Sequence, residues 1–171
     1  PHASNAATFN ITFTASDGIN TATSAAQEFT LRFEPVWTTG SQQAKIQPSD
    51  IAAQDNFGSD VSLSPDGNTA VIGSPYDSTY TGAVYVFTRS GSTWTQHSKL
   101  VANDAAQDSY FGRSVSLSGN GNYLIVGSAY TDTSYTNDGS AYIFVRDTSN
   151  NTWSQQSKLL ASNAEASDYF G

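Results

Sequence analysis

The feature that most constrains the fold is an internal repeat, in which a Phe-Gly pair recurs at nearly regular intervals. The pairs begin at Phe57, Phe111 and Phe170, so they are separated by 54 and then 59 residues. A lysine lies 12 residues before every pair, and a tryptophan lies 17 residues before the last two pairs: Lys45, Lys99, Lys158, Trp94 and Trp153. A period of this length indicates one supersecondary unit that occurs more than once.

The two complete units differ in length in only two short stretches. The stretch between Gly73 and Gly82 is three residues shorter than its counterpart between Gly127 and Gly139. The next stretch, which ends at a tryptophan, is two residues shorter in the first unit. We expect both stretches to be loops, because loops tolerate changes of length better than strands do.

Each unit is predicted to form four strands. In the first unit, residues 59–64 alternate apolar and polar side chains, and a Pro-Asp-Gly-Asn turn leads to the apolar run 70–72. Residues 83–87 are β-branched or aromatic, and residues 94–100 form a more polar fourth strand. The second unit repeats this order, with a turn at 119–122 and strands at 124–126, 141–145 and 153–159. We expect the first strand to be half-buried and the second to be covered on both faces.

Four-stranded antiparallel units of this length are typical of β-propeller blades, in which the inner strands are buried between neighbours and the outermost strand is solvated. The sequence therefore predicts an all-β fold with about two blades of an incomplete ring. The repeated lysines fall on the outermost strands. We expect them to act there as surface charge that prevents edge-to-edge pairing.

The order of these motifs resembles the FG-GAP repeat, the blade motif of integrin α-subunit propellers and of many secreted bacterial and phage proteins. Beside Phe-Gly, the shared elements are Val-Ser-Leu-Ser, a tight turn, an apolar strand that ends in Gly-Ser, and Gly-Ala-Val-Tyr-Val-Phe. The resemblance covers roughly residues 37–171. It implies a β-propeller, extracellular placement, and a role in adhesion or in recognition of carbohydrate or protein. The residues that carry the motif are expected to be structural: Phe57, Gly58, Gly73, Trp94, Phe111, Gly112, Gly127 and Trp153.

Two features depart from integrin-type repeats. Integrin-type blades often hold calcium in a carboxylate-rich loop, whereas the turns at 65–68 and 119–122 are short and contain a single carboxylate, Asp66. We therefore expect no metal site and no cofactor, although calcium binding occurs in the family. Propellers close with 4 to 8 blades, and this chain holds two, an incoming strand at 37–45 and a third repeat that begins at residue 170. We expect further blades in the same longer polypeptide or in neighbouring subunits.

Residues 1–36 have a different pattern. Alternating apolar residues at 8–14 and 29–33 predict two strands, and Ala-Ser-Asp-Gly at 15–18 predicts a turn. This segment resembles the closing hairpin of a cadherin-like or other immunoglobulin-like β-sandwich. The predicted domains are therefore the end of such a domain at 1–36 and FG-GAP blades at 37–171, with repeats near 57–110 and 111–169.

Composition excludes several classes of function. The 171 residues include 7 Lys and Arg against 15 Asp and Glu, and a net charge of -8 disfavours binding to nucleic acid. Cysteine is absent, which removes disulfides and thiolate chemistry, and no apolar run is long enough to span a membrane. His2 and His97 are the only histidines, and the sequence contains no nucleophile elbow, zinc-protease motif or P-loop. We predict a protein that is not an enzyme and that is extracellular, on a cell surface or on a virion surface.

The best candidates for ligand binding lie in the loops of variable length. Tyrosines there suit stacking on sugars or packing on a partner, and carboxylates lie beside them: Tyr76, Asp77, Tyr80, Tyr130, Asp132, Tyr135 and Asp138. Small polar residues of the linkers share the repeat register and would either collect on one rim of the ring or cap the turns between blades: Asp50, Asp104, Asn163, Asp55, Ser109 and Asp168. The sequons at Asn10 and Asn150 are candidate glycan acceptors if the source is a secretory eukaryote.

Two functional hypotheses follow from these residues. The first is a non-catalytic structural or adhesion module, a segment of a large modular surface protein, filament or virion fibre. The alternative is a recognition head whose loops bind a cell-surface receptor or carbohydrate. The partners expected are further blades and cell-surface glycans or proteins. The difference in loop length between the units leans toward recognition.

Overall fold

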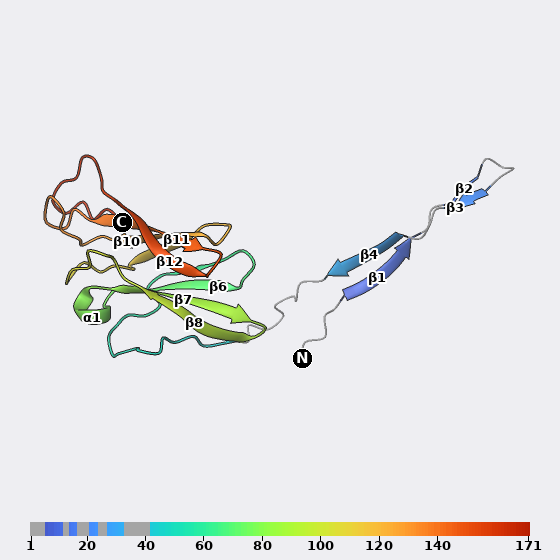
Figure 1. Cartoon of the computed structure of the whole chain (residues 1–171), viewed down its shortest axis with the longest axis horizontal. Coiled ribbons are helices and arrows are strands. Elements are labelled where there is room, and N and C mark those ends of the chain that lie inside the picture. Colours follow the sequence, from blue (N-terminus) through green and yellow to red (C-terminus); the bar gives the residue numbers. More distant parts are fainter. Residues whose placement is uncertain (1–5, 12–13, 17–20, 24–26, 33–41) are drawn as a thin grey trace. The chain divides into compact units, whose positions relative to one another are not determined.

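The computed structural model describes residues 6–11, 14–16, 21–23, 27–32 and 42–171. The chain divides into two compact units, Pro1–Ser41 and Gln42–Gly171. In Figure 1 the described strands of the first unit are blue, and the second unit runs from cyan to red.

The first unit contains two short antiparallel ladders. Strand β1 (Ala6–Ile11) pairs with β4 (Gln27–Arg32), and β2 (Thr14–Ser16) pairs with β3 (Thr21–Thr23). The strands expected at 8–14 and 29–33 overlap β1 and β4, whereas the turn expected from residue 15 begins inside β2. The side chain of the candidate glycan acceptor Asn10 lies outside the described residues. The immunoglobulin-like origin of this unit stays a prediction.

The second unit contains two four-stranded antiparallel sheets with the same strand order. The first blade is β5 (Val61–Leu63), β6 (Thr69–Ser74), β7 (Ala83–Ser90) and β8 (Thr93–Leu100). The second blade is β9 (Ser114–Leu117), β10 (Tyr123–Ser128), β11 (Ser140–Asp147) and β12 (Thr152–Leu159). A single turn, α1 (Asp77–Tyr80), lies between β6 and β7. These sheets confirm the predicted all-β fold with four-stranded antiparallel blades.

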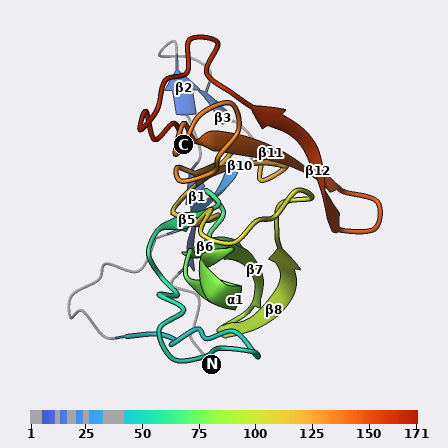
Figure 2. The same ribbon diagram turned by 90° about the vertical axis from the view of Figure 1, so that its left-hand side faces the viewer.

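The two blades lie side by side and share their irregularities (Figures 1 and 2). In both, the register between the third and fourth strands shifts once, after Val86 in the first blade and after Ile143 in the second. Such a bulge increases the local twist of the sheet. Side chains of the outer strands β8 and β12 are largely exposed or half-exposed, as predicted for outermost strands.

The main core lies between the blades. Val71, Val84 and Val86 of the first blade are almost completely buried there. The second blade contributes residues from β9, β10 and β11 and from its Phe-Gly pair: Phe111, Val115, Leu124, Val126, Tyr142 and Phe144. Burying one side chain of this size contributes about 1.5–3 kcal/mol. This layer therefore holds the two blades together.

A smaller core covers the opposite face of the first blade. It contains the buried residues Ala70, Ile72, Ala83, Tyr85 and Phe87. Three partly buried side chains pack against it: Ile46, Phe57 and Trp94. The segment before the first blade, which contains Ile46, thus helps to close this face.

Two expectations about burial are wrong. The alternation at 59–64 predicts buried Val61 and Leu63, but these side chains are 64% and 58% exposed. Val115, the counterpart of Val61, is buried because the first blade packs on it. The run 124–126 predicts a strand covered on both faces, yet Ile125 is 40% exposed whereas its counterpart Val71 is fully buried. In each case no other blade covers that face among the described residues.

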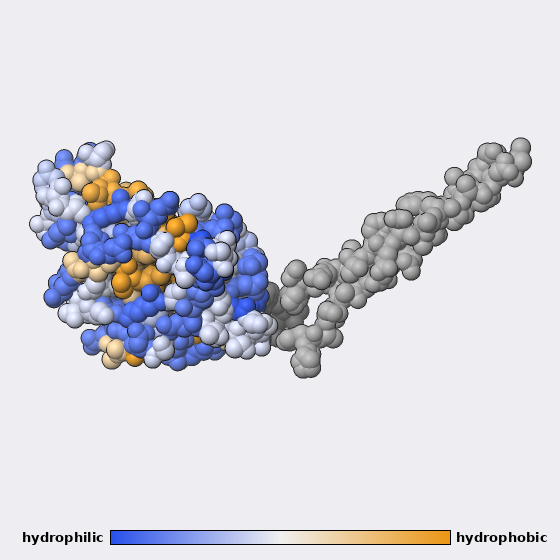
Figure 3. Space-filling view, in the orientation of Figure 1, coloured by the Kyte–Doolittle hydropathy of each residue, from blue (hydrophilic) through white to orange (hydrophobic). Residues whose placement is uncertain are grey.

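The incoming strand expected at 37–45 lies partly outside the described residues. Residues 42–45 form no strand, and residues 37–41 lie outside the described part of the chain. None of the helices in the described residues is long and apolar enough to cross a membrane. Figure 3 shows a mainly hydrophilic surface on the second unit, with small groups of apolar residues.

Candidate functional site on the loop side of the blades

The Phe-Gly pair belongs to two blades at once. Phe111 N donates a hydrogen bond to Thr81 O of the preceding blade at 3.1 Å. Within its own blade, Gly112 N donates to Gly127 O at 3.0 Å, and the ring of Phe111 packs edge-on against Tyr142 with centroids 5.4 Å apart. The pair therefore acts as a staple between consecutive blades.

Glycine is required where this staple touches the preceding blade. A Cβ atom at Gly73 would lie 1.9 Å from Gly112 O, and one at Gly82 would lie 2.1 Å from Phe111 O. Gly82 also has a φ of 85°, in the left-handed region that side chains disfavour. Both copies of the repeat have glycine at these positions because two backbones approach each other there.

Side chains of the first blade also satisfy the free edge of β9. Asp60 Oδ2 accepts a hydrogen bond from Val115 N at 2.7 Å, and Ser62 Oγ accepts one from Leu117 N at 3.0 Å. These amides face the first blade rather than β10, and an unpaired amide between packed blades would be costly. The contact between the blades is thus polar along β9 and apolar in the core formed by the following strands.

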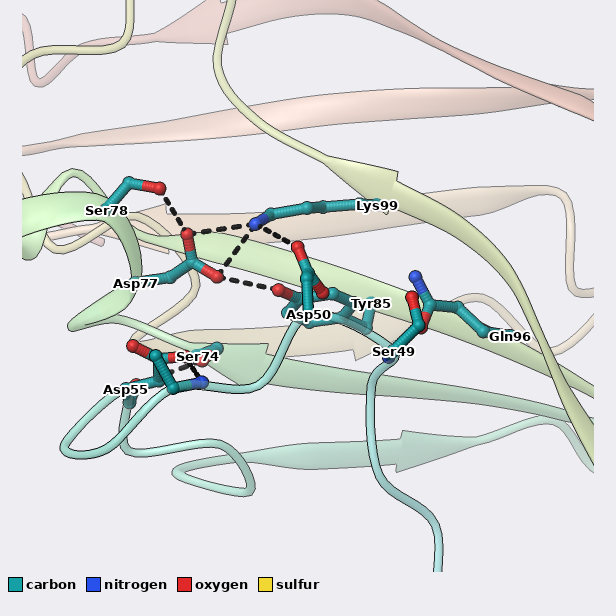
Figure 4. A network of polar contacts seen from close by, with 10 residues as sticks. Ser49, Asp50, Asp55, Ser74, Asp77, Ser78, Tyr85, Gln96 and Lys99 are labelled. Atoms are coloured by element: carbon teal, nitrogen blue, oxygen red, sulfur yellow. Dashed lines mark hydrogen bonds and ion pairs between the residues drawn. The ribbon is translucent and has the colours of Figure 1, made fainter.

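A lysine on the outer strand ties the first blade to the linker that precedes it (Figure 4). Lys99 Nζ lies 2.7 Å from Asp50 Oδ2 and 2.9 Å from Asp77 Oδ2. The same ammonium group lies over the ring of Tyr85, 5.2 Å from its centroid. The Tyr85 hydroxyl donates to Asp77 Oδ2 at 2.6 Å, which completes the network.

The second blade repeats this arrangement with one carboxylate fewer. Lys158 Nζ lies 2.6 Å from Asp104 Oδ2 and 5.4 Å from the centroid of the Tyr142 ring. Thr131 occupies the position that Asp77 has in the first blade. The two paired lysine side chains are only 30% and 24% exposed. A linker carboxylate pairs with each of them, and their expected role in preventing edge-to-edge pairing stays a prediction.

The linkers are fixed at further points. Ser49 N and Asn103 N each donate a hydrogen bond at 2.8 Å, to Gln96 Oε1 and Gln155 Oε1 of the outer strands. Each blade is thus tied to its own linker by both a lysine and a glutamine.

Two linker carboxylates cap turns in the manner the sequence suggests. Asp55 accepts a hydrogen bond from Ala52 N at 2.6 Å, and Asp168 accepts one from Glu165 N at 2.7 Å. Ser74 Oγ donates to the carbonyl oxygen of Asp55 at 2.9 Å (Figure 4). The linker residues therefore support the backbone.

The network around Lys99 shifts the pKa values of its members. Burial raises the pKa of Asp77, but hydrogen bonds from Ser78, Tyr85 and Lys99 outweigh burial and hold it below 3.8. Burial lowers the pKa of Lys99, but its contacts with Asp50, Tyr85 and Asp77 outweigh burial and raise it above 10.5. Both groups therefore stay charged around neutral pH, unlike a general acid or base, whose pKa lies near the working pH.

The carboxylates of the longer loop also serve the fold. Asp138 is fully buried and accepts hydrogen bonds from Thr133 N and Tyr135 N at 2.9 and 3.0 Å. Hydrogen bonding, first of all from Thr133, holds the pKa of Asp138 well below its ordinary value. Asp132 Oδ1 accepts a hydrogen bond from Asn137 N at 2.7 Å. These contacts give the loop its shape.

Tyrosine rings form a continuous row across the side of both blades that carries the β6–β7 and β10–β11 loops, which we call the loop side. We call the following set the tyrosine row: Tyr76, Tyr80, Tyr110, Tyr130 and Tyr169. The centroids of Tyr76 and Tyr80 lie 5.5 and 5.6 Å from that of Tyr110. The row continues through Tyr130, which is 4.8 Å from Tyr110 and 5.1 Å from Tyr169. Contacts of this length are typical of packed aromatic side chains.

The backbone is left-handed at three of these tyrosines. The φ angle is 63° at Tyr80, 55° at Tyr110 and 52° at Tyr169. In α1, Tyr80 follows Ser78 and Thr79, whose φ angles of 50° and 61° make this turn left-handed as well. Bulky residues rarely adopt this conformation, which costs on the order of 1–3 kcal/mol each.

The row remains partly open to solvent. Tyr76, Tyr80 and Tyr169 are 36%, 38% and 44% exposed. Burial by the neighbouring rings, together with the negative charge of Asp108, raises the pKa of Tyr110. The hydroxyl of Tyr110 therefore stays protonated, as a hydrogen-bond donor, beyond the usual pH range of a tyrosine.

Residues 40–87 and 94–144 match the family described as the FG-GAP repeat, and together these segments make up more than half of the chain. The chain belongs to the FG-GAP repeat family. FG-GAP repeats form non-enzymatic propeller modules and typically occur in extracellular proteins. The matched segments contain both Phe-Gly staples that precede complete blades.

One similar solved structure is the crystal structure of Sqt1 from Saccharomyces cerevisiae. Its TM-score is 0.46 at 10% sequence identity, and the match covers 67% of this chain and 26% of that chain. The chain thus corresponds to about a quarter of the length of that structure. No curated protein matches this FG-GAP chain in sequence.

The structure brings together only some of the loop residues that the sequence suggests as ligand-binding. Three of them belong to the tyrosine row: Tyr76, Tyr80 and Tyr130. Tyr135 is exposed but makes no ring contact with the row among the described residues. Sequence reasoning missed Tyr110 and Tyr169, although each directly precedes a Phe-Gly pair of the FG-GAP repeat. That shared position was the available signal.

The other predicted sites have a plain structural setting. Asn150 lies in the exposed turn between β11 and β12, where its Oδ1 accepts hydrogen bonds from Thr152 N and Oγ1. Glycan attachment at Asn150 stays a prediction. In the part of the chain that the structure describes, no group of three or more His, Cys, Asp or Glu side chains could hold a metal ion.

Proposed function

We propose that this chain is a non-catalytic structural and adhesion module of an extracellular protein, a segment of a large surface protein, filament or virion fibre. In this proposal its FG-GAP blades accept further blades. The supporting observation is one exposed face of the second blade, which we call the trailing face. It surrounds a shallow hollow lined by Ser114, Val115, Ser116, Ile125, Gly127, Ala141, Phe170 and Gly171.

The trailing face carries the counterparts of the residues by which the first blade holds the second. Ser116 corresponds to Ser62, whose hydroxyl accepts a hydrogen bond from β9. Ile125 corresponds to Val71, which is buried in the core between the blades. One polar and one apolar position are therefore retained and open on the second blade, whereas Ser114 stands where the first blade has Asp60.

The first blade has an open face of the complementary kind, which we call the leading face. Val61 and Leu63 are exposed on it, and they correspond to Val115 and Leu117, which pack against the first blade. An occupant with the β-strand pattern Val-Ser-Leu thus fits the trailing face. We infer that this occupant is another FG-GAP blade, from the same polypeptide or from a neighbouring subunit.

The charge state of the polar network supports a non-catalytic role. Lys99 and Asp77 are held in their charged forms by each other and by Asp50 and Tyr85. The repeat uses these groups to tie blades to linkers. Extracellular placement rests on the family, in which such repeats typically occur outside the cell.

Sedimentation velocity of the 171-residue chain over a range of concentrations tests the proposal. We expect reversible head-to-tail association that either Ile125→Asp on the trailing face or Val61→Asp on the leading face weakens. Gln156→Asp, which adds the same charge to an exposed position of the outer strand, is the matched control and should leave association unchanged.

A mixing experiment sharpens this test. A heterologous interface joins two different surfaces, so Ile125→Asp and Val61→Asp chains each keep one intact face. Their mixture should form dimers but no longer assemblies. A wild-type chain that stays monomeric at all concentrations, or association that neither substitution weakens, would contradict the proposal.

A second candidate function is recognition of a cell-surface ligand through the loops. The tyrosine row is the observation that favours it.

A further inference from the structure

We propose that the tyrosine row binds a neutral polysaccharide chain. The row lies on loops and linkers and includes no residue of the trailing face. The inference rests on the second candidate function, recognition through the loops, and not on the stacking of blades.

The fold alone does not account for tyrosine at two positions of the row. Asn56, Tyr110 and Tyr169 occupy the same place before Phe-Gly, and all three have φ angles between 52° and 55°. Asparagine tolerates this left-handed conformation, whereas a bulky aromatic residue adopts it at a cost. Tyr110 is only partly buried, and Tyr80, whose φ is also left-handed, is 38% exposed, so burial offsets that cost only in part. Placing the rings on the surface thus serves something other than folding.

The chemistry of tyrosine suits a sugar. The apolar face of the ring packs against the C–H groups of a pyranose, and the hydroxyl exchanges hydrogen bonds with sugar hydroxyls. Ring contacts continue without interruption from Tyr80 in the first blade to Tyr169 after the second. A single sugar ring is about as large as one tyrosine ring and would cover only part of the row. An extended chain of sugars fits its whole length.

The surrounding charges favour a neutral chain. Lys99 and Lys158 are engaged in ion pairs with linker carboxylates. Arg113 lies over the ring of Tyr130, 5.5 Å from its centroid, while Asp108 sits close enough to raise the pKa of Tyr110. With a net charge of -8 for the chain, a sulfated or phosphorylated glycan would be repelled. Carboxylates such as Asp108 accept hydrogen bonds from neutral hydroxyls.

A protein partner fits these features less well. The centre of a protein interface is enriched in tyrosine and arginine but depleted of aspartate. Tyr130 with Arg113 over its ring matches such a centre, whereas Asp108 next to Tyr110 does not. Aspartate beside the rings is better matched by hydroxyl-rich sugars.

The probes are four neutral polymers and one polyanion: barley β-glucan, galactomannan, dextran, chitohexaose and heparin. Isothermal titration calorimetry with the full chain should detect binding of at least one neutral polymer and none of heparin. Tyr130→Ala and Tyr76→Ala should each weaken that binding about two- to tenfold, the range that aromatic contacts of this kind represent.

Tyr123→Ala is the matched control. Tyr123 is also an exposed tyrosine, but it begins β10 at the end away from the loop side, so its removal should leave binding unchanged. Tyr130→Leu keeps an apolar side chain of similar size and separates loss of stacking from loss of folding. Without any substitution, sugar added to the wild-type chain should perturb the tyrosine absorbance.

Three results would overturn the proposal: no binding to any of the neutral polymers, binding to heparin alone, or an equal loss of affinity in the Tyr123→Ala control. The variant Ile125→Asp distinguishes this proposal from the stacking of blades. It should keep full affinity for the sugar while it loses association.

Discussion

The ammonium group of Lys99 lies 2.7 Å from the carboxylate of Asp50, which is 49 residues earlier in the chain. Asp50 lies in the linker that precedes the first blade, and Lys99 lies on β8, the last strand of that blade. The pair therefore joins the two ends of one blade unit. Lys158 and Asp104 repeat this contact at 2.6 Å, so it belongs to the repeat rather than to one blade. An outer strand without this tie would be held to its blade by a single ladder and would fray more easily.

Replacing the lysine should destabilise the first blade more than the second. Lys99→Met leaves two carboxylates without their cation, and Asp77 is buried, so we expect a loss of about 2–3 kcal/mol in the free energy of unfolding. Lys158→Met leaves a single carboxylate, the half-exposed Asp104, without its cation. We expect a loss of about 1 kcal/mol or less in the free energy of unfolding. Urea denaturation followed by tryptophan fluorescence measures both. Equal losses of unfolding free energy in Lys99→Met and Lys158→Met would show that the contact of Lys99 with Asp77 does not stabilise the first blade.

The stability of the protein should fall in acid through the same network. The pKa of Asp77 is lowered below 3.8 in the folded chain. A carboxylate of this kind stabilises the fold at pH values above its unfolded pKa, and this contribution disappears as the pH falls through the folded pKa. Wild type should therefore lose stability from about pH 4 downward. Asp77→Asn should be less stable at pH 7, and its difference from wild type should narrow toward pH 2. A constant difference across that range would rule out this linkage.

The staple between blades should not tolerate a methyl group. In Gly73→Ala the new Cβ would meet Gly112 O at 1.9 Å, where only backbone can move away. We expect a loss of about 3 kcal/mol, at the upper end of the cost of overpacking. Gly119→Ala is the matched control, since nothing lies within 4 Å of its Cβ and its φ is not left-handed. Thermal unfolding of the two variants side by side measures the contrast, and similar melting temperatures would mean that the blades can separate at low cost.

The repeat and its strands could be predicted because their signals are local. The alternation around Ser62, the turn at 65–68 and the apolar run at 70–72 each act over a few residues, and the second copy confirmed their order. The register of the lysines and of Asp50 was visible too. What the sequence did not show is that Asp50 meets the lysine of the following strand pair, because that contact depends on how the linker crosses the finished blade.

Burial could not be predicted in the same way. Val61 and Val115 have the same local pattern, yet one is exposed and the other is buried, because only the second has a blade packed on it. The sequence of one repeat unit does not specify which unit packs against it. Its alternation of apolar and polar residues therefore indicates which face is apolar, but not whether another blade covers that face.

The candidate site shows a similar division. Tyr76 and Tyr130 were predictable as loop tyrosines in variable stretches, while Tyr110 and Tyr169 lie in linkers of constant length, where no ligand-binding residue was expected. The row exists because the linkers before Phe111 and Phe170 hydrogen-bond to the loop of the preceding blade, as Tyr110 N does with Tyr80 O at 2.9 Å. The shared position of Tyr110 and Tyr169 before Phe-Gly is visible in the sequence, but their contacts with the loops of neighbouring blades are not.

The loop at 131–139 should open when its buried carboxylate is removed. Asp138 accepts hydrogen bonds from the amides of Thr133, Ser134 and Tyr135, and all three donors would lose their partner in Asp138→Ala. Unsatisfied donors favour an open loop. Limited proteolysis at this loop should therefore become about tenfold faster or more, since losing even one hydrogen bond to a charged acceptor is worth roughly a factor of ten.

Asp132→Ala is the control for this loop, because Asp132 accepts one exposed hydrogen bond, from Asn137 N. Its cleavage rate should stay close to that of wild type. Asp138→Asn should fall between the two, because an amide keeps one accepting oxygen but can no longer serve all the donors that converge on the carboxylate. If Asp138→Ala were cleaved no faster than Asp132→Ala, the ring contacts of Tyr130 with its neighbours, rather than the carboxylate, would be what keeps this loop closed.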